Sequence, residues 1–195
     1  MKQESPSVLG YALLGLIHHK PSSGYDLRKT FAETAMGSYS SSPGAIYPAL
    51  ERLEKRGLIR SVVEEGPGMR RRRVYRVTPN GVRELKQWLS SAITRGAIVR
   101  GLAELMLRFA FMERALGAQA SIQFLRNLKA ELKAYVPTLK AFLRKNGPKM
   151  PLSARLALDS GIRNYEALTR WTDYAIRTYE AAVASETKKT GKIRE

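Results

Sequence analysis

Cysteine is absent from the 195 residues of this chain, and histidine occurs only at His18 and His19. A chain without thiols forms neither disulfide bonds nor thiolate metal sites, and it is compatible with a reducing cytoplasm. The two histidines stand at the end of a predicted helix, where the helix dipole favours positive charge. We therefore predict no metal site and no cofactor.

Long hydrophobic runs and the side-chain constellations of enzymes are also missing. No run approaches the roughly 18 apolar residues of a membrane span, and the apolar stretch at residues 8–17 lacks a signal-peptide cleavage site. No histidine has the context of a nucleophile's base, and no glycine-rich phosphate loop or paired carboxylates stand out. We expect a cytoplasmic protein that is neither an enzyme nor a membrane protein and has no catalytic residues.

Acidic residues are scarce relative to basic ones. The chain has 34 lysines and arginines against 17 aspartates and glutamates, a net charge of +17. A field of this sign attracts polyanions, which are nucleic acids or anionic membrane surfaces. The alternative is that the excess charge only keeps the protein soluble.

Hydrophobic periodicity predicts helices at residues 8–19, 22–37 and 43–56. A serine stands before or at the start of each helix as a candidate N-cap: Ser5 or Ser7, Ser22 or Ser23, and Ser42. Two strand-like segments follow at residues 58–65 and 71–78 with the turn Gly-Pro-Gly between them, and a fourth helix continues to residue 93. Three helices followed by a β-hairpin predict a winged helix-turn-helix.

Only helical patterns follow, at residues 102–116, 118–145 and 152–189. The whole chain is therefore predicted to be mainly α-helical with a small β-hairpin. We expect a DNA-binding domain at residues 1–95. A long-helix domain for dimerisation, with a candidate effector site, is expected at residues 96–195.

The segment MRRRRVYRVT places four arginines, Arg70–Arg73, in the predicted wing at residues 66–76. Adjacent guanidinium groups repel one another, and DNA phosphates can supply the countercharge. Glu64 and Glu65 on the opposite strand can neutralise part of the run. Strand alternation predicts that Tyr75 points inward and Val74 outward. The alternative is a solvated charge run on a loop.

The helix at residues 43–56 is the predicted recognition helix. Ile46, Leu50 and Leu53 form an apolar stripe that should face the core. Recognition helices contact bases mainly through their N-terminal residues. The candidate DNA contacts on this helix are Ser42, Gly44, Tyr47 and Arg52.

The phrases LGYALLGLI, SSGYDL, GAIYPALERLEKRGLI and RRRVYRVTPNGVRELKQWL resemble the PadR family of bacterial transcriptional regulators. The resemblance implies a homodimeric repressor that binds a pseudo-palindromic operator in double-stranded DNA. It implies DNA contacts by Ser42, Gly44, Tyr47 and Arg70–Arg73. It also implies that Tyr25 is either a phosphate contact or a structural residue. Some members of the family sense aromatic or phenolic acids.

The C-terminal half carries many aromatic residues. Phe109, Trp171 and Tyr174 are candidates to line an effector pocket for a small aromatic ligand, and plain packing of these rings is the alternative. A non-specific, architectural DNA- or RNA-binding protein is the alternative function. Sequence-specific RNA binders usually stack bases on exposed aromatic rings, and the predicted wing offers only Tyr75, which should point inward.

Overall fold

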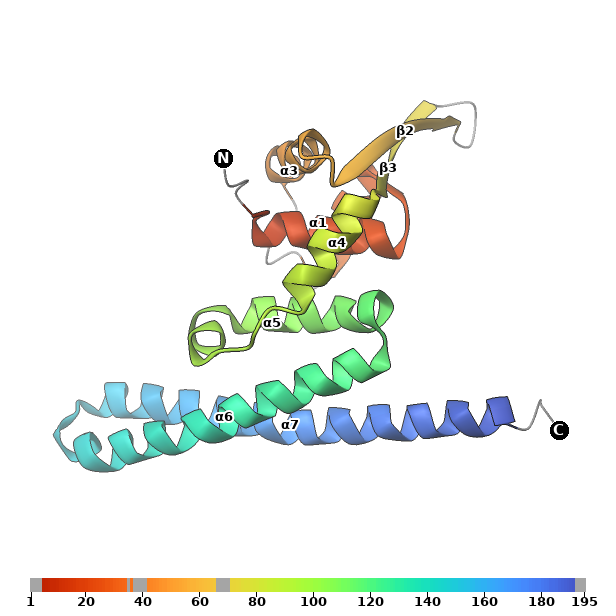
Figure 1. Cartoon of the computed structure of the whole chain (residues 1–195). Helices are drawn as coiled ribbons and strands as arrows, with labels where there is room; N and C mark the ends of the chain where they lie inside the picture. The colour runs from red at the N-terminus through yellow and green to blue at the C-terminus, as the bar shows by residue number, and fades with distance from the viewer. Residues whose placement is uncertain (1–4, 35, 37–41, 66–70, 192–195) are drawn as a thin grey trace. The chain divides into compact units, whose positions relative to one another are not determined.

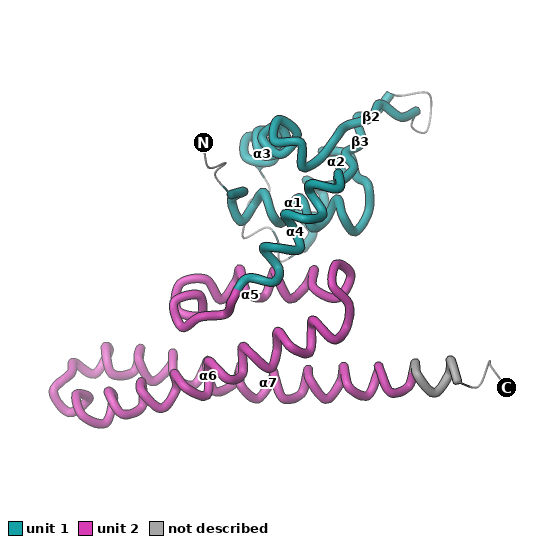
Figure 2. The backbone as a smooth tube through the Cα atoms, viewed as in Figure 1, with its two compact units in different colours: residues 1–91 teal, residues 92–195 magenta. Residues whose placement is uncertain are grey.

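The computed structural model describes residues 5–34, 36, 42–65 and 71–191. The chain divides into two compact units, residues 1–91 and residues 92–195, which Figure 2 distinguishes by colour. Each unit has its own buried apolar residues, so each is described by itself.

Apart from the short strand β1, the first unit has the predicted order of helices and strands (Figure 1). Its elements are α1 (Val8–His19), β1 (Ser22–Ser23), α2 (Gly24–Glu33), α3 (Pro43–Lys55), β2 (Ile59–Glu65), β3 (Arg71–Val77) and α4 (Pro79–Leu89). Ser7, Ser23 and Ser42 are the N-caps of α1, α2 and α3. The winged helix-turn-helix prediction is therefore confirmed.

Several details of the prediction were wrong. The fourth helix ends at Leu89 and not at residue 93. The second helix ends at Glu33 and not at residue 37, because Thr34 has extended backbone angles of φ −128° and ψ 170°. The sheet also contains a third strand in addition to the two strands of the hairpin, because β1 pairs with β3. The order of strands in the sheet is β1-β3-β2. Ser23 of β1 lies opposite Val74.

The position of β3 in the middle of the sheet changes which of its side chains are buried. Tyr75 is 6% exposed, as predicted, but Val74 is also only 2% exposed. The expected outward orientation of Val74 was wrong because β3 has a neighbouring strand on both sides, and α1, α2 and α4 also contact it. Exposure does not alternate beyond this covered part either, since the consecutive residues Arg71–Arg73 are all exposed.

The core of the first unit joins the helices to the base of the hairpin. Ile46, Leu50 and Leu53 of α3 are buried, as the apolar stripe predicted. Gly81 in the first turn of α4 lies so close to the chain before β2 that a Cβ atom there would be 2.0 Å from the carbonyl oxygen of Leu58. Only glycine fits this contact between two backbones.

The described part of the second unit contains three long helices and a short 3-10 turn. They are α5 (Arg95–Leu116), α6 (Ala118–Asn146), η3 (Gly147–Lys149) and α7 (Leu152–Gly191). Non-helical angles at Gly101 kink α5, so the predicted helix at 102–116 is its second part. α6 and α7 pack along each other (Figure 1). Within the described ranges, no helix is long and apolar enough to span a membrane.

Candidate nucleic-acid interface

The exposed side of α3 begins at its N-cap. The Ser42 hydroxyl oxygen accepts a hydrogen bond from the backbone N–H of Gly44 at 3.2 Å, which satisfies one of the free donors of the first turn. Ser42 and Gly44 are exposed, and the side chain of Tyr47 is 46% exposed. These three predicted contact residues therefore lie together at the accessible start of α3.

Arg52 is exposed but faces a different direction from Tyr47. Five residues of α-helix turn through 500°, so the two side chains leave the helix about 140° apart. Tyr47 lines a cleft of about 260 Å³ together with Arg73 and Tyr75. Arg52 instead lines a groove beside the start of α1 with Pro6. The structure does not bring Arg52 together with Tyr47 and the hairpin.

The ring of Tyr47 lies against Gly24 at the start of α2. A Cβ atom at Gly24 would lie 2.5 Å from Cε1 of Tyr47, which is well inside van der Waals contact. The absence of a side chain at this position lets the ring sit close to the α2 backbone. The next residue, Tyr25, is 60% exposed, and the guanidinium carbon of Arg28 lies 5.4 Å from its ring centroid.

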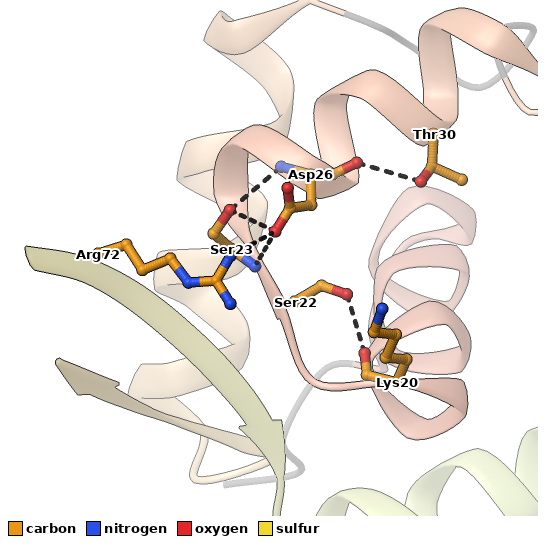
Figure 3. Close-up of polar contacts among 6 residues, drawn as sticks. All are labelled: Lys20, Ser22, Ser23, Asp26, Thr30 and Arg72. Atoms are coloured by element: carbon orange, nitrogen blue, oxygen red, sulfur yellow. Dashed lines mark hydrogen bonds and ion pairs between the residues drawn. The ribbon is translucent and has the colours of Figure 1, made fainter. Parts of the chain in front are cut away.

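The start of α2 is held by a capping box that also reaches the hairpin (Figure 3). The backbone N–H of Asp26 donates to the Ser23 hydroxyl at 3.2 Å, and the Ser23 hydroxyl and N–H both donate to the Asp26 carboxylate. The hydrogen bond from the Ser23 side chain lowers the pKa of Asp26 below its ordinary value. Arg72 of β3 approaches the same carboxylate at 3.8 Å.

Glu54 of α3 contacts both strands of the hairpin. One carboxylate oxygen accepts hydrogen bonds from the N–H of Ser61 at 2.9 Å and from its hydroxyl at 2.6 Å. The other oxygen accepts from the guanidinium of Arg73 at 2.5 Å. The guanidinium carbon of Arg73 also lies 5.5 Å from the ring centroid of Tyr75, whose pKa is raised by burial. Ser61 belongs to β2 and Arg73 to β3, so one side chain joins α3 to both strands.

The predicted run of arginines has unequal surroundings. Arg70 lies outside the described residues, and Arg71, Arg72 and Arg73 are exposed on β3. Glu64 does not neutralise them as expected, because its carboxylate pairs with Arg76 at 2.8 Å. Arg72 and Arg73 instead approach Asp26 and Glu54.

Within the part of the chain that the structure describes, Arg71 makes no ion pair. Its charge is therefore the one most available to a ligand among the described arginines of the predicted run.

Four residues of this surface were not predicted from the sequence, namely Gly24, Asp26, Glu54 and Ser61. The capping box could have been read from the sequence, because Ser23 and Asp26 have the spacing of that motif. Glu54 stands seven residues after Tyr47, two helical turns along the same side of α3. The spacing does not identify its partners, since Ser61 and Arg73 come from separate strands.

In the second unit, the structure brings two of the three candidate effector residues together. The rings of Phe109 and Trp171 meet edge to face with centroids 5.6 Å apart. Phe124 and Tyr179 also contact Phe109. Tyr174 lies outside this cluster and is 62% exposed.

Residues 13–87 match the sequence model of the "Transcriptional regulator PadR-like family". The negative transcriptional regulator PadR of Bacillus subtilis is 34% identical over 82 residues, which are 42% of this chain and 45% of that protein. The transcriptional regulator YqjI of Escherichia coli is 38% identical over 58 residues, which are 30% of this chain and 28% of that protein. The chain thus covers less than half the length of these curated relatives.

Two solved structures of Bacillus subtilis PadR are also similar to this chain. The complex with operator DNA has 24% sequence identity and a TM-score of 0.43, and the match covers 90% of this chain and 99% of that one. The complex with p-coumaric acid has 23% identity and a TM-score of 0.41, with 89% and 99% covered.

Proposed function

We propose that the chain is a member of the PadR-like family of transcriptional regulators, whose sequence model its residues 13–87 match, and that it regulates transcription by binding double-stranded DNA. In this proposal it is a homodimeric repressor that acts in the cytoplasm on a pseudo-palindromic operator. The observation that carries the proposal is the continuous surface formed by α3 and the arginine-bearing strand β3. Glu54 links these two elements directly through its hydrogen bond to Arg73.

The parts of this surface suit different features of DNA. The start of α3, with Ser42, Gly44 and Tyr47, is exposed and can enter a major groove, where the tyrosine can contact a base edge or a thymine methyl group. The arginines of β3 can lie along the phosphates. Tyr25 at the start of α2 is accessible for a phosphate contact. Arg52 faces away from the hairpin, so it can contact the DNA backbone only at a place farther from the hairpin.

The second unit is proposed to join two protomers. Exposed apolar side chains on α6 and α7, namely Phe142, Leu152, Leu156 and Tyr174, support this role because a partner helix could cover them. Phe109 and Trp171 are the proposed contacts for a small aromatic effector. Tyr174 belongs with the exposed residues and not with their ring cluster.

The first experiment is selection of bound sequences from a pool of random duplexes, followed by footprinting on the DNA upstream of the protein's own gene. We expect one enriched sequence with two related half-sites about 10 base pairs, or a multiple of this spacing, apart. Binding without any enriched sequence would support the architectural alternative. No binding to any DNA duplex at low salt would refute the proposed function and would leave only the RNA-binding form of the alternative.

A further inference from the structure

Glu54 is an acidic residue within a surface that is proposed to meet a polyanion. Its side chain is only 27% exposed, and it lies between the recognition helix and the hairpin. A carboxylate near phosphates weakens binding by repulsion. Glu54 should therefore make a favourable contribution to binding that offsets this repulsion.

The contacts of Glu54 indicate what that contribution is. It receives two hydrogen bonds from Ser61 on β2 and one from the guanidinium of Arg73 on β3. Hydrogen bonds to an ionised group are shorter and stronger than those between neutral groups. Glu64, by comparison, pairs with Arg76 inside the hairpin and does not connect it to α3.

We propose that Glu54 is a positioning residue that fixes the hairpin at one distance and angle from the recognition helix. Arg73 then serves mainly as the partner of Glu54, and Arg71 is the described wing arginine that neutralises a phosphate. This inference rests on the proposed function and adds to it the separate tasks of neighbouring arginines.

Fixing the wing matters for sequence discrimination more than for general affinity. An operator complex needs α3 in the groove and the wing on the phosphates at the same time, in one register. A wing whose orientation relative to α3 is not fixed can still contact phosphates on any duplex. Loss of Glu54 should therefore reduce the ratio of operator affinity to random-duplex affinity, while random binding stays equal or becomes tighter.

The test compares Glu54→Gln, Arg73→Gln, the double variant and Arg71→Gln in the full chain. A glutamine at position 54 can still accept from Ser61 through its carbonyl, but its amide cannot accept from Arg73. We expect Glu54→Gln and Arg73→Gln each to lower the affinity ratio roughly tenfold, and the double variant no further, because each removes the same charge-assisted bond. Arg71→Gln should instead reduce the salt slope by about 0.9 on both duplexes.

Glu64→Gln is the matched control, since it removes the same charge from an ion pair that stays within the hairpin. It should leave the affinity ratio unchanged. The inference is overturned if Glu54→Gln keeps the wild-type ratio, if Glu64→Gln lowers it equally, or if Arg73→Gln reduces the salt slope as Arg71→Gln does.

A measurement without DNA separates this inference from the proposed function. The backbone N–H of Ser61 donates to Glu54, so its hydrogen exchange should be about tenfold faster or more in Glu54→Ala and unchanged in Glu64→Ala. If the protein binds no duplex, the proposed function fails, and the exchange rate still reports whether Glu54 holds the hairpin. Unchanged exchange in Glu54→Ala would overturn the positioning role.

Discussion

The contact between Gly24 and the ring of Tyr47 can be tested by the single change Gly24→Ala. The added Cβ would lie 2.5 Å from Cε1 of Tyr47 and 3.3 Å from Cδ1 and Cζ. Carbon atoms in ordinary contact are about 3.5–4.0 Å apart. The ring must therefore retreat by about 1 Å at its nearest edge.

The effect on folding should be small. Overpacking a well-packed site usually costs about 1–3 kcal/mol. Tyr47 is nearly half exposed, so its ring can swing outward and the cost should fall at the lower end. Replacing glycine by alanine in a helix returns about 0.4–1 kcal/mol through the unfolded state. The free energy of unfolding should consequently change by less than about 1 kcal/mol.

The effect on operator binding should be larger than the effect on stability. A base contact of the kind proposed for Tyr47 contributes about 1–3 kcal/mol to discrimination, and a displaced ring should lose most of it. In a Tyr47→Ala background no ring remains to displace, so Gly24→Ala should add no further loss. This non-additivity separates a steric effect on the tyrosine from a direct contact at residue 24.

The assay is fluorescence anisotropy on the selected operator with the wild type, both single variants and the double variant, with thermal unfolding followed in parallel. Gly161→Ala on α7 is the control for the substitution itself, because a Cβ there meets nothing within 4 Å. Wild-type affinity of Gly24→Ala would refute the reasoning. So would an equal loss in the presence and absence of the Tyr47 ring.

Three further predictions concern stability, pH and assembly. Gly81→Ala should lower the free energy of unfolding by about 3 kcal/mol or more in denaturant titration, because its Cβ would collide with the backbone at Leu58; an unchanged midpoint would contradict this. The hydrogen bond from Ser23 lowers the pKa of Asp26 in the folded protein. The ionised carboxylate therefore stabilises the fold at pH values above the ordinary pKa of aspartate, and this stabilisation is lost as the pH falls through the lowered pKa. Acidification should therefore destabilise the wild type more than Asp26→Asn, and equal pH profiles would contradict it. A fragment of residues 1–91 should fold and be monomeric by light scattering while the full chain is dimeric, and a dimeric fragment would place the dimer contact in the first unit.

The sequence by itself determined the local features of this protein. The serine caps of α1, α2 and α3 and the buried stripe of α3 could be predicted because the relevant residues are neighbours along the chain. The hairpin could be predicted from the change of period and the turn residues. The charge run was visible as such, and it predicts a site where a polyanion would bind.

The tertiary structure alone decided which residues act together. Val74 is buried because β1, some 50 residues earlier in the chain, pairs with β3 and because α1, α2 and α4 contact that strand. The arginines of β3 have different partners because Asp26 and Glu54 approach them from α2 and α3. Tyr47 faces the hairpin and Arg52 does not, because the packing of the buried side of α3 sets which of its faces meets β3. The hydrophobic period and the secondary-structure propensity of a segment depend on residues that are neighbours in the sequence. The contacts described above depend on how elements far apart in the sequence pack together, and a local sequence pattern does not specify that packing.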